Sequence, residues 1–265
     1  MESFAGAPSP PRYLFEGKQG SSHARNLALL EARAEIIVFT DDDVLGDAAW
    51  LRKLVEVFTL PGNENVGVVG GEVFHIYPDG LPAWVAGYYR PFGYRKDSGP
   101  LKPGQLPSTA NVAIRKKVLD QVGGFRTDLG RLPNRLTGGE DLDLMRRIRS
   151  AGYDLWYHPG ASLQHVVPGG RLTLRYISKF CYDSSYSRVI ERRGSARFWA
   201  WVFSRILVYA LSVPLSLAIS GLCLLVRQRG RAKRWLTRAA KGAGYIAGSF
   251  YVIRCVLTGR KPGVS

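Results

Sequence analysis

A run of 21 residues without a charged side chain, from Ile206 to Val226, restricts the structure of this chain more than any other feature of its sequence. About 20 apolar residues in a helix match the hydrocarbon thickness of a bilayer, so the run predicts an association with a membrane. The whole chain has 265 residues and is 46% hydrophobic. This composition excludes a disordered chain and a polytopic membrane protein, and the length suffices for one large domain with an appendage.

The net charge of +16 comes entirely from the C-terminal third of the chain. Residues 1–170 contain 19 basic and 19 acidic residues, whereas residues 171–265 contain 18 basic and 2 acidic residues. Basic residues that flank an apolar segment indicate an anionic membrane surface, because a nucleic-acid interface interleaves them with exposed aromatic residues. We therefore expect a globular domain at 1–195, a basic membrane-associated region at 196–265, and no nucleic-acid partner.

The N-terminal residues and the cysteines indicate the compartment. The sequence MESFAGAPSPPRY has no apolar h-region, so it predicts no cleavable signal peptide. The three cysteines are scattered and match neither a disulfide framework nor a zinc site. We expect the globular domain to lie on the cytoplasmic side of the membrane.

Helices and strands alternate along the first 75 residues. Ser21 and Ser22 are predicted to cap a helix that ends near Arg33, and Asp47 is predicted to cap a second helix. Residues 35–40 and 66–74 are predicted strands. This order indicates an α/β fold, a mostly parallel sheet with helices on both faces.

The second half of the globular domain is less regular. Residues 77–107 are rich in Pro, Gly and aromatic residues and are expected to form one wall of a binding site, with Trp84, Tyr88, Tyr89, Phe92 and Tyr94. A helix is predicted to begin at Glu140 and Asp141 and to end at Gly152. Two short strands, 153–157 and 161–165, are predicted on either side of Pro159 and Gly160.

The candidate metal ligands follow the first predicted strand. Asp41 and Asp43 lie on one side of an extended chain, about 7 Å apart at roughly 3.3 Å per residue, and two such carboxylates can bind a divalent cation. Their place at the carboxyl end of a strand is where ligands bind in such sheets. The alternative is a solvated acidic turn.

Two further groups are candidates for chemistry. Glu140 and Asp141 form the first turn of a helix, and the preceding Gly138 and Gly139 leave room for a ligand beside a general base. His165 ends a short strand and fits a metal ligand, a base or an ordinary strand-end histidine.

Four segments, in this order and spacing, resemble the family 2 glycosyltransferases, which are inverting nucleotide-sugar enzymes of GT-A fold. The segments are SHARNLALLEARAEIIVFTDDDVLGDAAWLRKLVEVF, VGVVGGEV, NVAIRKKVLDQVGGF and GGEDLDLMRRIRSAGYDLWYHPGASLQH, and the resemblance covers about residues 12–180. It implies transfer of a sugar from a nucleotide-sugar donor to a lipid-linked or polysaccharide acceptor in one displacement, without a protein nucleophile.

The resemblance also implies individual roles. Asp41 and Asp43 match the ends of a DXD-type motif that holds Mg²⁺ or Mn²⁺ against the sugar diphosphate, and Asp42 between them is assigned to the substrate. Asp141 matches the residue that deprotonates the acceptor hydroxyl, with Glu140 as the alternative base. His165 matches a histidine that completes the metal shell in some relatives.

Five more residues are assigned to substrate binding. The resemblance puts Arg25 and Asn26 near the nucleotide and Asn111 in the sugar or acceptor pocket. The QxxRW motif of processive synthases is absent, and Arg171 and Arg175 are candidates to replace its diphosphate contact.

The sequence departs from the family pattern at its start. Family members begin with a strand–helix–strand unit that reads the base and ribose, so we expect about 70–90 residues of the usual fold to be missing and a sheet edge to be exposed. Two alternative functions stay open: a metal-dependent phosphohydrolase or nuclease, and a non-catalytic remnant that serves as a binding module.

The basic flanks of Ile206 to Val226 both favour the cytosolic face. We therefore expect Pro214 and Gly221 to break the segment into a re-entrant hairpin rather than a single span. Gly242 to Leu257, which contains Arg254, is predicted to be interfacial or a second short segment.

Overall fold

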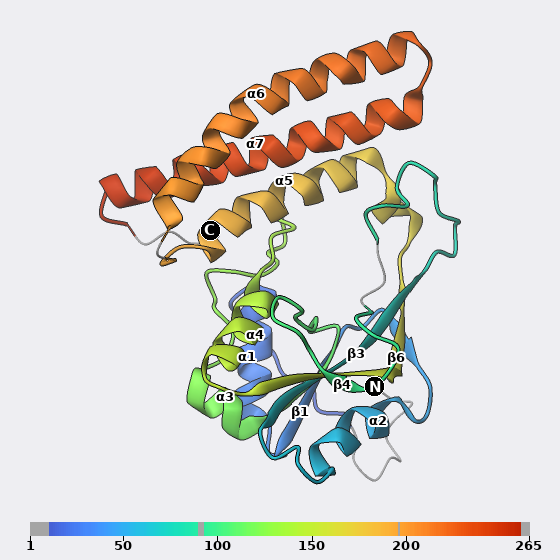
Figure 1. Cartoon of the computed structure of the whole chain (residues 1–265), viewed down its shortest axis with the longest axis vertical. Coiled ribbons are helices and arrows are strands. Elements are labelled where there is room, and N and C mark those ends of the chain that lie inside the picture. The colour runs from blue at the N-terminus through green and yellow to red at the C-terminus, as the bar shows by residue number, and fades with distance from the viewer. Residues whose placement is uncertain (1–10, 90–92, 196, 261–265) are drawn as a thin grey trace.

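The computed structural model describes residues 11–89, 93–195 and 197–260. A six-stranded sheet in the order β1-β5-β3-β6-β2, with β4 beside β6, forms the centre of the N-terminal part, and three long helices lie above it (Figure 1). The strands are β1 (Ile36–Thr40), β2 (Val44–Gly46), β3 (Val66–Ile76), β4 (Gly99–Pro100), β5 (Asn111–Arg115) and β6 (Asp154–Val166).

The sheet is mixed, so the predicted mostly parallel sheet is wrong. Strands β1, β3 and β6 run in one direction, while β5, β4 and β2 are antiparallel to their neighbours. The chain from β1 to β3 crosses over through the predicted second helix, so these two strands run in the same direction without being neighbours. In its described residues the chain from β3 to β5 contains turns and β4 but no helix, and β5 returns antiparallel between β1 and β3.

Helices cover both faces of the sheet, as predicted. On one face, α1 (Ser21–Glu31), α3 (Lys116–Val122) and α4 (Glu140–Ser150) enclose a core that includes Ile114 and Met145. On the other face, α2 (Trp50–Glu56) and the 3₁₀ turn η2 (Val57–Thr59) bury Leu54 against Val69. In the described part of the chain, the outer edge of β1 pairs with no strand, in agreement with the expected exposed edge.

Two local predictions require correction. No side chain caps α1, because Ser21 and Ser22 lie inside its first turn and bond to a distant loop instead. The Ser22 hydroxyl donates to the carbonyl of Leu129, and the Ser21 hydroxyl accepts from the amide of Arg131. The predicted Asp47 cap of α2 is also wrong, because the N-cap residue is Ala49 and no side chain caps the helix. Asp47 instead accepts a hydrogen bond from the amide of Ala49 at 2.7 Å.

The two short strands predicted around Pro159 and Gly160 are one strand, β6. Its register with β3 shifts because Gly71 pairs with His158 whereas Glu72 pairs with Ser162, so the residues between bulge out of the ladder. Gly71 makes this bulge possible, because a Cβ there would clash with the carbonyl of Ala161 and the amide of Asn111.

The C-terminal helices are α5 (Leu174–Glu191), α6 (Phe198–Leu225) and α7 (Arg229–Leu257). The predicted break at Pro214 and Gly221 is wrong, because α6 continues through both residues. The chain reverses at Arg227, which has a φ of 57°. Gly242 to Leu257 belongs to the single long helix α7.

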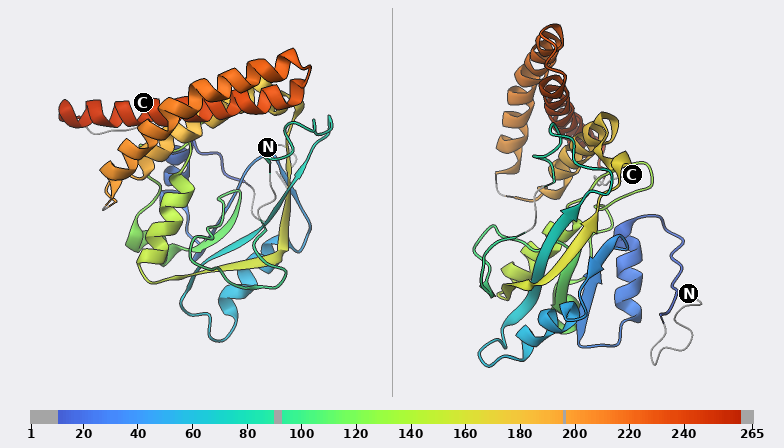
Figure 2. Two further views of the ribbon diagram at one scale, coloured as in Figure 1. Left: turned by 45° about the horizontal axis from the view of Figure 1, so that its top comes forward. Right: turned by 90° about the vertical axis from the view of Figure 1, so that its right-hand side faces the viewer.

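Helix α7 lies between α5 and α6 (Figure 2). Gly242 faces Val213 and Tyr209 of α6, while Gly244 and Gly248 bring the α7 backbone against the backbone of α5 at Tyr182 and Tyr186. Within the described residues, α6 is the one helix that is long and apolar enough to cross a membrane, and 17% of its most apolar window is buried.

Candidate active site

The pairing of β2 with β6 brings the candidate metal ligands together. Val44 pairs with His165 immediately after the three aspartates that end β1. The His165 Nε2 atom lies 3.1 Å from Asp43 Oδ1 and 3.9 Å from Asp41 Oδ2. One ligand atom from each of Asp41, Asp43 and His165 lies within 4.8 Å of the others.

This set of ligand atoms fits a divalent cation. Two carboxylates and an imidazole suit Mn²⁺, and Mg²⁺ is also held by carboxylates and substrate phosphates. Two arginines share the negative charge of the aspartates: Arg171 Nη1 lies 2.9 Å from Asp43 Oδ2, and Arg25 Nη2 lies 3.7 Å from Asp41 Oδ1. Both guanidinium groups therefore lie where a diphosphate beside the cation would need positive partners.

Arg25 also connects the aspartates to the acidic pair at the start of α4. Its Nη1 atom lies 2.8 Å from Glu140 Oε1, and its guanidinium lies over the Phe125 ring. The Glu140 side chain is 8% exposed, and its second oxygen is buried without a hydrogen-bond partner among the described residues. Glu140 is thus held in an ion pair.

Asp141 is better suited to proton transfer than Glu140. Burial and the adjacent charge of Glu140 raise the pKa of Asp141 to about 6. One carboxylate oxygen of Asp141 accepts from the amide of Leu142 at 2.8 Å, which fixes its orientation. A carboxylate with a pKa near neutrality is matched to the work of a general base.

The structure keeps two of the predicted substrate-binding residues away from a ligand. The Asn26 amide exchanges two hydrogen bonds of 2.8 Å with the backbone of Phe125. Asn111 is 1% exposed; it donates to the carbonyls of Glu72 and Ala161 and accepts from the indole of Trp50. Both amides stabilise the fold, because their polar atoms are used within the protein.

The other residues predicted to bind substrate are Arg171, Arg175 and Asp42, and they differ in their contacts. Arg171, in the 3₁₀ turn η3 (Gly169–Leu172), reaches Asp43, whereas Arg175 is exposed on the first turn of α5. Of these two arginines, only Arg171 forms an ion pair in the described part of the chain. Asp42 is exposed in the turn between β1 and β2.

The sequence interpretation missed His75. It pairs with His165 across β3 and β6, and the two ring centroids are 5.6 Å apart. Burial and the neighbouring His165 lower the pKa of His75. The ring of Tyr89 lies 5.6 Å from His75, and its hydroxyl donates to the carbonyl of Arg171. The register between two distant strands creates this contact, and no local sequence signal reports it.

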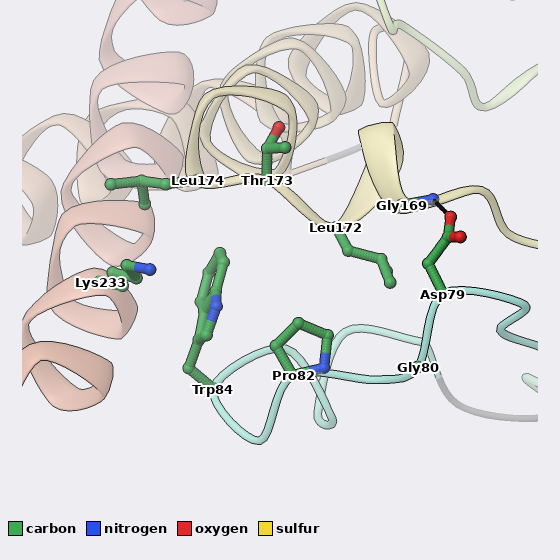
Figure 3. A pocket seen from close by; sticks show the side chains of 9 residues that line it. All are labelled: Asp79, Gly80, Pro82, Trp84, Gly169, Leu172, Thr173, Leu174 and Lys233. Carbon is green, nitrogen blue, oxygen red and sulfur yellow. Dashed lines mark hydrogen bonds between the residues drawn. The ribbon is translucent and has the colours of Figure 1, made fainter.

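Part of the aromatic segment 77–107 does line a pocket. Trp84 packs with Leu172 and Val167 beside η3, while Tyr94 bonds to the carbonyl of Leu106, and Phe92 lies outside the described residues. The pocket has a volume of about 550 Å³ and is lined by Asp79, Gly80, Pro82, Trp84, Gly169, Leu172, Thr173, Leu174 and Lys233 (Figure 3). The ammonium of Lys233, on α7, lies over the Trp84 ring.

The family model for glycosyltransferase-like family 2 matches residues 11–180. The chain belongs to glycosyltransferase family 2. It is 28% identical over 173 residues to the uncharacterized protein y4gI of Sinorhizobium fredii, covering 57% of this chain and 17% of that protein. It is 28% identical over 154 residues to the pre-mycofactocin glycosyltransferase of Mycobacterium tuberculosis, covering 56% of this chain and 30% of that protein. This family 2 chain therefore spans less than a third of the length of these relatives.

A solved structure agrees with the family assignment. The mannosyltransferase PcManGT from Pyrobaculum calidifontis, in complex with GDP-Man and Mn²⁺, superposes with a TM-score of 0.50 at 21% identity. The match covers 89% of this family 2 chain and 67% of PcManGT. It confirms the expected GT-A-like α/β fold.

Proposed function

We propose that this chain is the catalytic part of a metal-dependent, inverting glycosyltransferase that uses a nucleotide-diphosphate sugar. The observation that carries the proposal is the convergence of Asp41, Asp43 and His165 within 4.8 Å, joined through Arg25 to the acidic pair Glu140 and Asp141. Family membership and the fold shared with PcManGT, a protein solved with GDP-Man and Mn²⁺, support the same reaction class.

In this proposal Asp41, Asp43 and His165 hold Mg²⁺ or Mn²⁺. A divalent cation there would neutralise charge on the departing nucleoside diphosphate. Arg171 and Arg25 are placed to pair with diphosphate oxygens, and Asp42 is exposed on the same turn.

Asp141 is the proposed general base. It accepts the proton of the acceptor hydroxyl while that oxygen attacks the anomeric carbon and the bond to the diphosphate breaks. One displacement inverts the anomeric centre, so no protein nucleophile is required. Glu140 is paired with Arg25, and its adjacent charge contributes to the raised pKa of Asp141.

We further propose that the acceptor is lipid-linked or a polysaccharide, that residues 1–195 perform the transfer, and that residues 196–265 attach the protein to a membrane. The pocket between η3 and α7 supports this assignment, because Pro82, Trp84 and Leu174 form apolar walls and Lys233 supplies a cation. Since nucleotide sugars are cytosolic, the catalytic part is assigned to the cytoplasmic side.

Calorimetric titration of the full chain with UDP- and GDP-sugars tests the metal and the donor together. We expect donor binding in Mn²⁺ that is lost in excess EDTA, and Asp43→Asn should weaken Mn²⁺ affinity at least about tenfold. Asp120→Asn, which removes the same charge from the exposed end of an ion pair on α3, is the matched control and should bind like the parent. Equal donor binding with and without EDTA would refute the metal dependence.

A further inference from the structure

The outer surface of α6 is apolar along its whole length. Its exposed large side chains are Trp199, Phe203, Leu207, Val208, Leu211, Leu215, Leu217, Leu222, Leu224 and Leu225. The side chains that face α7 include the buried Ser216, Ser220 and Cys223. An apolar helix surface of this size, without a protein partner in the described chain, requires a nonpolar environment.

Helix α7 carries a row of cations beside this surface. Arg231, Arg234, Arg238 and Lys241 follow one another at spacings of three and four residues, and all are exposed. Residues at these spacings lie on one side of a helix. The α7 residues that contact α6, such as Gly242, and those that contact α5, such as Gly244, lie on either side of this row.

Two contacts between α6 and α7 show which residues of α6 lie beside the cations of α7. The Ser220 hydroxyl donates to the carbonyl of Ala232 at 3.0 Å, and Gly242 lies against Val213 and Tyr209. The helices are antiparallel, so Arg234 and Arg238 flank the level of Ser216. Ser216 is the middle residue of the charge-free run Ile206 to Val226.

A hairpin that crossed a bilayer with this run at its centre would therefore carry two exposed arginines to the bilayer midplane. Arginine in that position is strongly disfavoured, because its charge loses water without gaining a partner. A hairpin that lies in the membrane surface accommodates both the apolar surface of α6 and the arginines of α7. Its apolar side chains enter the acyl region, while its arginines bind lipid phosphates.

We propose that the α6–α7 hairpin lies in the plane of an anionic membrane surface and does not cross it. The apolar surface of α6 enters the interface, and the cationic row of α7 contacts the phosphates. This inference rests on the membrane attachment in the proposed function and specifies its geometry and its lipid partner.

Vesicle partition of the full chain tests the lipid contact. We expect binding to vesicles of phosphatidylcholine with phosphatidylserine, weaker binding as salt is raised, and weak binding to phosphatidylcholine alone. Arg234→Glu with Arg238→Glu should lower partition at least about tenfold, because each basic residue near such a surface contributes several-fold. The control Arg52→Glu with Lys117→Glu makes the same charge change on exposed residues of α2 and α3 and should lower partition much less. Equal partition of the two double variants would overturn the proposal.

A cysteine at the hairpin reversal tests the orientation in cells. In Gly230→Cys, the added thiol should react with an impermeant maleimide only after lysis, above the labelling of the parent with its three native cysteines. Labelling of intact cells would establish a crossing and overturn the proposal. Donor binding in solution, measured on the same variants, reports folding and tests the proposed function separately.

Discussion

Arg25 gives the two neighbouring carboxylates of the site, Glu140 and Asp141, different surroundings. It contacts Asp41 and Glu140 at once, and it is held in place over the Phe125 ring. Glu140 gains an ion-pair partner from this arrangement, whereas burial and the adjacent charge of Glu140 raise the pKa of Asp141. Two adjacent carboxylates in one helical turn therefore have different surroundings, because Arg25 forms an ion pair with Glu140.

We expect Asp141→Asn to lower kcat about 10²–10⁴-fold while donor affinity changes little, because the amide keeps the shape but accepts no proton. The parent kcat/KM should fall tenfold per pH unit below about pH 6 and level off above it, since the base works only when deprotonated. Steady-state kinetics from pH 4.5 to 8 with calorimetric donor titration checks both expectations.

The comparison with Glu140→Gln assigns the base between the two neighbours. If Asp141→Asn stays active while a correctly folded Glu140→Gln is inactive, Glu140 is the base. Circular dichroism on each variant separates this result from unfolding, because Glu140 is buried and paired with Arg25.

At the scale of elements, local sequence patterns were sufficient to predict that β1, α2 and α4 exist and where they lie in the chain. The apolar run that ends in Asp41 to Asp43 is a strand with its aspartates at the carboxyl end, and Glu140 opens α4. Sheet direction was not predictable, because β5 enters between β1 and β3 without a sequence marker. The internal hydrogen bonds of Asn26 and Asn111 were not predictable for the same reason, since their partners lie far along the chain.

The bulge in β6 depends on one glycine of β3. Gly71→Ala should lower the free energy of unfolding by about 1–3 kcal/mol or more, because the new methyl group meets backbone and a fully bonded amide. Gly87→Ala is the control, since nothing lies within 4 Å of its Cβ position, and should change stability by less than about 0.5 kcal/mol. Urea unfolding measures both, and equal stabilities would contradict the packing assigned to the bulge.

At the scale of the whole molecule, α5 joins the site to the hairpin. It begins two residues after η3, which carries Arg171 to Asp43, and its backbone contacts α7 at Gly244. Gly244→Ala should lower the unfolding midpoint in detergent, because a methyl group there meets the Tyr182 backbone. Gly221→Ala, on the open side of α6, should leave the midpoint unchanged or raise it, since alanine favours a helix. If both variants lower the unfolding midpoint, any added methyl group destabilises these helices, and the result would contradict a specific role for the contact at Gly244.

The contact of α5 with α7 through glycines also has a mechanical consequence. Two backbones that touch at Gly244 and Gly248 have no long side chains between them that could yield, so α5 and α7 tilt and slide together. On a membrane, this stiffness would hold Asp43 and Asp141 at a constant height above the lipid phosphates. Under the proposed membrane attachment, an acceptor hydroxyl would then have to reach that height.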